Sequence, residues 1–159
     1  MKESNIKVII AEPMRQTRIC TIKNELSEFQ RIVGGLIQTV YLPDDDEVVL
    51  ICNDSGKIDR LPWNRALSYN NKVWDLVAGP MIITGDDFIN GEFASLSDDL
   101  AEKYLKKFLD PEIHFMINEE VIASTFKDPM VDLENFSEFT TEGRRRKYDR
   151  LLRTDNIIY

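Results

Sequence analysis

The stretch ICNDSGKIDRLPWNRAL, residues 51–67, marks the change of local structure around which the chain is organised. It continues the nearly continuous apolar run EVVLIC at residues 47–52, which is typical of a central strand in a sheet. Asn53, Asp54 and Gly56 follow, and these residue types favour a turn. The sequence therefore predicts a buried strand that leaves the sheet through a tight turn.

The second half of this stretch is harder to explain by packing alone. Trp63, Asn64 and Arg65 place an aromatic face beside two planar hydrogen-bonding groups, which suits a planar or anionic ligand or the anchoring of a partner. The alternative is structural: Trp63 packs in the core, Asn64 caps a short helix beginning at Arg65, and Arg65 pairs with an acidic neighbour. Both interpretations remain open at this stage.

The rest of the chain predicts an α+β fold with a mostly antiparallel sheet, because the connections are too short for parallel crossovers. Two amphipathic helices should pack on this sheet. One is capped by Asn24 and ends at Gly34-Gly35, and the other is capped by Ser97. Asn90-Gly91 is typical of a two-residue hairpin. Further strands are expected in the apolar runs 6–11, 18–23, 36–42, 73–78 and 81–84.

The chain should divide into an α+β core domain at residues 1–109 and a C-terminal extension at residues 110–159. Residues 112–142 show no sustained period and predict weak helix or loop. Residues 140–153 predict a basic helix, which gives the extension its helical character. Its cluster of Arg144, Arg145, Arg146, Lys147 and Arg150 is a candidate contact for nucleic-acid phosphate or for an acidic protein surface.

Composition and charge exclude several classes. With 43% hydrophobic and 30% charged residues, the chain has the composition of a folded globular protein rather than a disordered one. The net charge of −8 is uneven: residues 143–159 carry +4, which leaves −12 on residues 1–142. Such an acidic body repels nucleic acid and suits a basic protein partner, mimicry of nucleic acid, or solubility alone. Cys20 and Cys52 lie in apolar runs and predict reduced thiols in a cytoplasmic protein, and no apolar run is long enough to span a membrane.

No catalytic, metal or phosphate-binding motif is found in the sequence. His114 is the only histidine, and its spacing from Glu112, Glu119 and Glu120 matches no zinc signature. Asp44 to Glu47 lacks the ligand spacing of a calcium loop and predicts a solvated turn. We therefore expect no metal and no cofactor, and a binding protein rather than an enzyme.

Several short motifs, taken in order, resemble a known family. They are IKVIIAEP, VGG, ICNDSGK, LPWNRAL, DLVAGPMIITG and FASLSDDLAEKYLKKF. Their order and spacing over about residues 5–109 resemble domain-of-unknown-function family 3846, whose members are small proteins of phages, conjugative elements and their bacterial hosts. The resemblance implies a mobile-element context but no activity. Its matching positions are Gly34, Gly35, Asn53, Gly56, Asn64, Arg65, Gly79 and Gly85, and residues 110–159 lie beyond it.

These observations lead to two hypotheses. The first is a small acidic accessory protein that binds a host protein with a basic surface, as an inhibitor of a defence or nucleic-acid-processing enzyme. The second is a module that binds a small nucleotide-like ligand at Trp63, Asn64 and Arg65, with Asn53, Gly34 and Gly35 as further candidate site residues. A membrane is excluded as a partner, and nucleic acid is expected only through the C-terminal basic helix.

Overall fold

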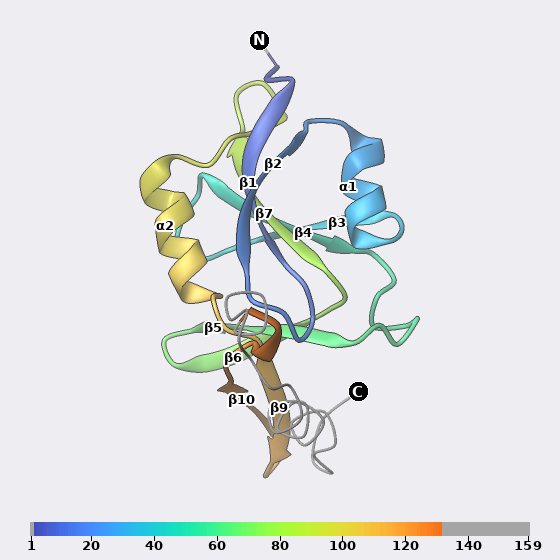
Figure 1. Ribbon diagram of the computed structural model, residues 1–159, viewed down its shortest axis with the longest axis vertical. Helices are drawn as coiled ribbons and strands as arrows, with labels where there is room; N and C mark the ends of the chain where they lie inside the picture. The colour runs from blue at the N-terminus through green and yellow to red at the C-terminus, as the bar shows by residue number, and fades with distance from the viewer. Residues whose placement is uncertain (1, 132–159) are drawn as a thin grey trace, which may run out of the picture.

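The computed structural model describes residues 2–131, and its elements alternate short strands with two helices (Figure 1). Every strand pairing is antiparallel, which confirms the predicted α+β class. The helices are α1 (Leu26–Val33) and α2 (Asp98–Lys107). The strands are β1 (Asn5–Ala11), β2 (Arg18–Lys23), β3 (Ile37–Tyr41), β4 (Val48–Asn53), β5 (Trp63–Tyr69), β6 (Lys72–Ala78), β7 (Met81–Asp87), β8 (Glu92–Ala94), β9 (Glu112–Ile117) and β10 (Glu120–Thr125).

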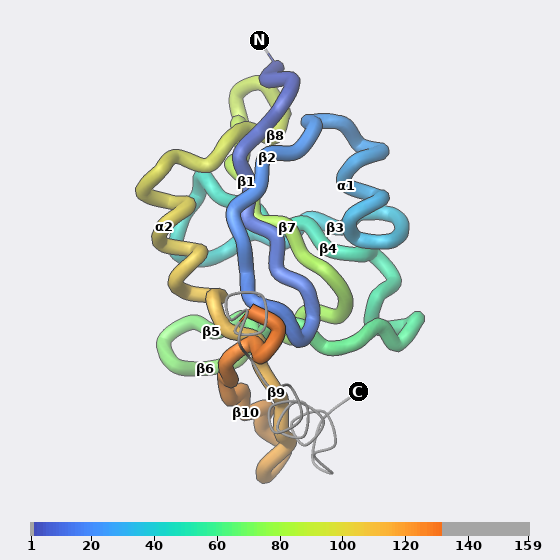
Figure 2. Tube along the Cα trace, in the orientation of Figure 1, coloured from blue at the N-terminus to red at the C-terminus, as the bar shows by residue number. Residues whose placement is uncertain are grey.

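The main sheet has the strand order β2-β1-β7-β4-β3, and β8 pairs with the last residues of β7. β5 and β6 form a separate hairpin, as do β9 and β10. The β9–β10 hairpin extends from the body at the end opposite to the N-terminus (Figure 2). β3 and β2 are therefore the two outer strands of the main sheet.

The sheet has an apolar core on each face because its strands carry apolar side chains at successive positions. On β7, Ile82 packs on the α1 side, while Met81 and Ile83 pack on the α2 side. The β5–β6 hairpin covers the α2 side as well, through Leu67 and Val77. Helices α1 and α2 thus lie on opposite faces of one shared sheet (Figure 1).

The helix ends follow the sequence with one correction. Ser97 caps α2 by accepting a hydrogen bond from the Leu100 amide at 3.2 Å, and Gly34 ends α1 with a left-handed φ of 80°. Asn24, however, is not the N-cap of α1. Its side-chain amide nitrogen donates to the Phe93 carbonyl at 3.0 Å, and Glu25 takes the cap position without a side-chain bond.

Three local predictions, at Arg65, at residues 112–125 and at Asn90-Gly91, differ from the structure. Arg65 lies in strand β5 and not at the start of a helix, and residues 112–125 form the β9–β10 hairpin where we expected weak helix or loop. The β5–β6 hairpin closes through Asn70-Asn71 and the β9–β10 hairpin through Asn118-Glu119, and all four residues have positive φ. The β7–β8 turn spans residues 88–91 rather than two residues, with the Gly91 amide bonded to the Asp87 carbonyl.

Other predictions concern residues beyond this description. The basic helix at residues 140–153 and its cluster lie outside the described residues. Within residues 2–131, no helix is long and apolar enough to cross a membrane, and both cysteines are free.

Candidate functional site

Arg65 is wholly buried, and its guanidinium is bonded entirely to the protein itself. Nε donates to the Phe108 carbonyl at 3.1 Å, and the two terminal nitrogens donate to further acceptors at 2.7–3.4 Å. A guanidinium has five N–H groups, and five bonds are formed, so none is left for a ligand. The remaining acceptors are the Glu12 and Arg15 carbonyls, the Asn64 amide oxygen and the Thr17 hydroxyl.

Asn64 extends the same network and is also wholly buried. Its amide nitrogen donates to the carbonyls of Ala11 and Gly79 at 2.8 and 2.9 Å, while its oxygen accepts from Arg65. The pair therefore ties β5 to the end of β1, the β1–β2 connection, the β6–β7 turn and the end of α2. We refer to Asn64, Arg65 and their acceptors as the polar clamp.

The Arg65 guanidinium remains positively charged although it is buried. Desolvation lowers the pKa of Arg65 to about 10, against the attraction of Glu112 and the neighbouring Asp110 and Asp128. The guanidinium is thus a cation at neutral pH, held mainly by backbone carbonyls. Because the Asn64 and Arg65 side chains do not reach the surface, they are not available to contact a partner.

The other residues singled out with the clamp are also held by local contacts. The Asn53 side-chain nitrogen donates to the Val33 carbonyl at 3.1 Å, and its side-chain oxygen accepts from the Ser55 backbone amide at 2.9 Å. A Cβ on Gly35 would lie 2.9 Å from the Asn53 nitrogen, so glycine permits the close approach of α1 to β4. Trp63 is half-buried, and its indole nitrogen has no hydrogen-bond partner within the described part of the chain.

His114 is buried as well, and its ring nitrogen lies 3.1 Å from a Glu112 carboxylate oxygen. The same oxygen accepts the Ala66 amide at 2.8 Å, which links β9 to β5. Among residues 2–131, no group of three or more histidine, cysteine or acidic side chains is placed to hold a metal ion.

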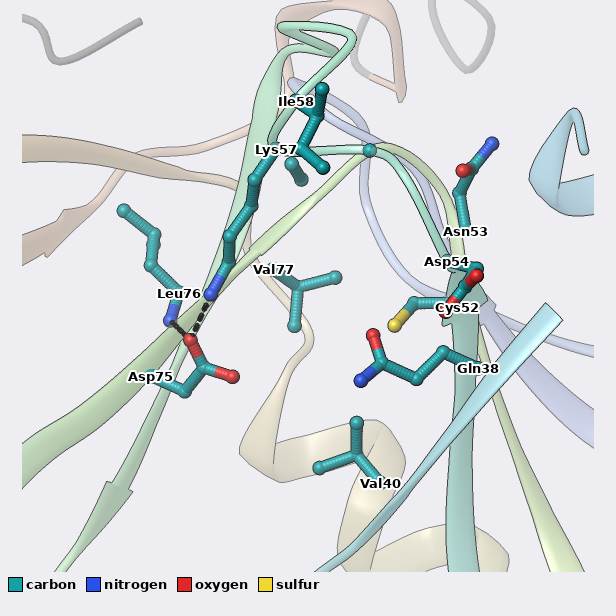
Figure 3. Close-up of a pocket in the computed structure, with 12 residues that line it drawn as sticks. Gln38, Val40, Cys52, Asn53, Asp54, Lys57, Ile58, Asp75, Leu76 and Val77 are labelled. Atoms are coloured by element: carbon teal, nitrogen blue, oxygen red, sulfur yellow. Dashed lines mark hydrogen bonds and ion pairs between the residues drawn. The ribbon is translucent and has the colours of Figure 1, made fainter. Parts of the chain in front are cut away.

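A cavity of about 270 Å³ lies between β3, the end of β4 and β6 (Figure 3). Gln38, Val40 and Cys52 form one wall and face Asp75 and Lys57 across the opening. Val40 and Val77 add apolar side chains to its lining, and Lys57 and Asp75 form an ion pair on one side. The sequence does not predict this cavity, because its walls come from three separate segments, within residues 38–40, 52–58 and 75–78.

The charge of this cavity is acidic overall. Asp54 and Asp75 both line it against the single cation of Lys57. Burial raises the pKa of the Cys52 thiol, and the nearby Asp75 raises it further, so the thiol is not an activated nucleophile. The cavity is thus suited to hold an apolar stem with a cationic tip, not to perform cysteine chemistry.

A second surface lies where β3 ends. The acidic run there is not simply solvated: Asp45 accepts from Lys103 and from the Tyr104 hydroxyl at 2.7 and 2.6 Å, and Asp44 pairs with Lys107 at 2.9 Å. These contacts fasten the β3–β4 loop to α2. The prediction of a solvated turn was therefore incomplete.

The remaining carboxylates of this region have no ion-pair partner among the described residues. The Asp86 amide donates to the Glu47 carbonyl at 2.9 Å, which places the end of β7 beside the β3–β4 loop. The Tyr41 and Phe88 rings stack there with centroids 6.2 Å apart, and both are exposed. We name this surface the acidic end: Tyr41, Asp46, Glu47, Asp86, Asp87, Phe88 and Ile89.

The fold and these surfaces define a small α+β protein with an internal polar clamp and an open, acidic outer surface. The model of the family described as a domain of unknown function (DUF3846) matches residues 6–109, and the chain belongs to this family. The resemblance inferred from the ordered motifs is thereby confirmed. Neither the comparison with curated proteins nor that with solved structures finds a match.

Proposed function

We propose that this protein acts by binding another protein through a basic surface of that partner, and that it has no enzymatic activity of its own. The observation that supports the proposal is the acidic end. There, carboxylates that have no ion-pair partner among residues 2–131 lie around exposed apolar side chains, among them Ile89 with 95% of its surface exposed.

The physical basis is the complementarity of charge and apolar surface. Carboxylates that lack a local cation attract lysine and arginine side chains of a partner and speed its approach. Exposed aromatic and aliphatic groups among them supply the anchoring contacts that charge alone does not give. The net charge of −8 favours the same class of partner.

The finer proposal concerns the biological setting. We propose an accessory protein of a phage or other mobile element that acts in the host cytoplasm. Its target would be a host defence or nucleic-acid-processing enzyme, since such enzymes carry a basic cleft for phosphate. The acidic end would occupy that cleft in place of nucleic acid.

The test is capture of partners by the full-length protein expressed in its bacterial host, at low and at high salt, with identification by mass spectrometry. We expect a nucleic-acid-binding protein to be retained at low salt and released as salt rises. Recovery of no partner at low salt would contradict the proposal.

A matched pair of variants locates the contact. Asp46→Lys combined with Glu47→Lys reverses two charges at the acidic end, and Glu119→Lys combined with Glu120→Lys makes the same change on the distant β9–β10 hairpin. The first should reduce capture at least tenfold and the second should leave it within about twofold. An equal loss in both would show a nonspecific charge effect rather than a binding surface.

A further inference from the structure

The edge strand β3 lacks the usual protection against pairing with another strand. In the described part of the chain it pairs only with β4, in an uninterrupted register of five residues. Its sequence, IQTVY, holds no charge and no proline, and exposed edges are normally guarded by one of these or by a bulge.

The direction of its backbone groups follows from one hydrogen bond. The Asp54 amide donates to the Leu36 carbonyl at 2.8 Å, which makes these two residues a bonded pair. Bonded pairs alternate along antiparallel strands, so the amides and carbonyls of Ile37, Thr39 and Tyr41 point away from β4. β3 therefore offers three residues with outward backbone donors and acceptors.

The opposite edge of the sheet behaves differently. β2 begins with Arg18 and ends with Lys23, and both side chains carry the same charge as a basic partner. Lysine and arginine at an edge discourage strand addition. The charge of Lys23 also opposes the expected class of partner, whereas Arg18 is paired with Glu12 at 3.2 Å. The two outer strands thus differ in the property that decides strand pairing.

The cavity lies directly beside the β3 edge. Gln38 and Val40 form its wall, so they project to the cavity side of β3, as alternate residues of an added strand would. Such a side chain would meet the apolar surface of Val40 and then the carboxylates of Asp54 and Asp75. Lysine and arginine match this order, with an apolar stem and a cationic tip.

We propose that β3 accepts an extended strand of the partner protein, and that a lysine or arginine of this strand enters the cavity toward Asp54 and Asp75. The inference rests on the proposed function and specifies the element of the partner that is bound. The added backbone bonds supply affinity, and the cavity supplies specificity. A second copy of this chain is the less favoured occupant, because its charge of −8 would be brought against the same charge.

The test uses a displayed library of random ten-residue peptides, selected on the full-length protein. The enriched peptides, once synthesised, should carry lysine or arginine between β-branched residues. Thr39→Pro removes an outward-facing amide and should weaken their binding at least tenfold. Thr21→Pro makes the same change in the middle of β2 and should leave binding unchanged. The Asn24 backbone amide donates to the Ser4 carbonyl, so the same alternation places the Thr21 amide on the outer side of β2.

Two further measurements keep the result interpretable if Thr39→Pro does not fold. Peptides N-methylated at alternate residues leave the protein unaltered and should bind at least tenfold more weakly in one of the two methylation registers. Asp75→Asn should weaken peptides with a central lysine more than the same peptides with norleucine there.

Four outcomes would overturn the inference. They are the absence of enriched peptides, equal binding to Thr39→Pro and Thr21→Pro, indifference to both methylation registers, and a wild-type dimer in sedimentation that Thr39→Pro dissociates. If Thr39→Pro still captures the partner in a salt-sensitive way, strand addition at β3 is contradicted while the proposed function stands. If reversing the charges of Asp46 and Glu47 leaves capture intact and the peptides still bind at β3, the acidic end is not the contact surface.

Discussion

Asp45 and Asp86 are carboxylates of the same region with opposite environments. Hydrogen bonds from Lys103 and the Tyr104 hydroxyl lower the pKa of Asp45, whereas burial raises the pKa of Asp86 against a hydrogen bond from Tyr41. A lowered pKa stabilises the fold above the unfolded value and loses that effect as pH falls through the folded pKa. A raised pKa has the reverse effect, because the folded protein then binds the proton more tightly.

This contrast predicts opposite effects of removing each charge. Asp45→Asn should destabilise the protein at pH 7 by about 1–2 kcal/mol, because two hydrogen bonds to a charged acceptor are weakened. Asp86→Asn should leave the stability unchanged or raise it at pH 7, since one Asp86 oxygen is buried without a partner among the described residues. Urea unfolding from pH 7 to pH 3 measures both differences, and each should shrink toward the acidic limit. Equal signs at pH 7 would contradict the assignment.

The residues next to Arg65 in the sequence do not determine what its guanidinium binds. Trp63-Asn64-Arg65 was correctly singled out as needing an explanation beyond simple packing. The acceptors of Arg65 other than Asn64 lie 43 to 53 positions away, however, in loops whose approach depends on the whole fold. A buried cation satisfied by backbone carbonyls and a cation waiting for a ligand have the same local sequence.

At the scale of elements, the two helices begin in different ways. Ser97 holds the first turn of α2, while Glu25 leaves the first turn of α1 without a side-chain acceptor. Glu25 nevertheless has the extended backbone, φ −135° and ψ 141°, that an N-cap requires. Glu28 stands three residues later, at the position that completes a capping box when serine is the cap.

We therefore predict that cap substitutions change stability in opposite directions. Ser97→Ala should lower the free energy of unfolding by about 1 kcal/mol, and Glu25→Ser should raise it by about 0.5–1 kcal/mol. Thermal unfolding followed by circular dichroism measures both. If Glu25→Ser destabilises the protein, the Glu25 side chain has a role that its hydrogen bonds do not show.

Strands with a continuous apolar run were predicted, including β6 from the run at residues 73–78, whereas β5, β9 and β10 and the turns of their hairpins were not. β1, β2 and β4 follow from apolar runs, α2 from its Ser97 cap and apolar face, and α1 from its apolar face and Gly34, although not from Asn24, because those signals are local. The β5–β6 and β9–β10 hairpins depend on Asn70-Asn71 and Asn118-Glu119. Asparagine takes positive φ less readily than glycine, so these turns are weak signals. The cavity beside β3 could not be predicted, since it needs β6 to lie opposite β3.

For the whole molecule, the two cores are built on the same strands and should form one cooperative unit. Ile82 and Ile83 are adjacent on β7, both are fully buried, and they face the α1 and α2 sides respectively. Trp63 and Trp74 both lie in the β5–β6 hairpin, on the α2 side of the sheet. Their fluorescence therefore reports one side of the molecule, while circular dichroism reports both.

Ile82→Ala and Ile83→Ala should each lower the free energy of unfolding by about 2–5 kcal/mol, because each removes the same buried atoms from a packed core. In both variants the fluorescence and circular dichroism transitions should coincide in urea. The informative case is Ile82→Ala, whose cavity lies on the face away from both tryptophans. If its helical signal is lost at a lower urea concentration than its fluorescence change, the α1 side unfolds alone. The β3 edge adjoins both cores, so unfolding of the α1 side alone would also disrupt β3. A stable strand-binding edge therefore requires that the two transitions coincide.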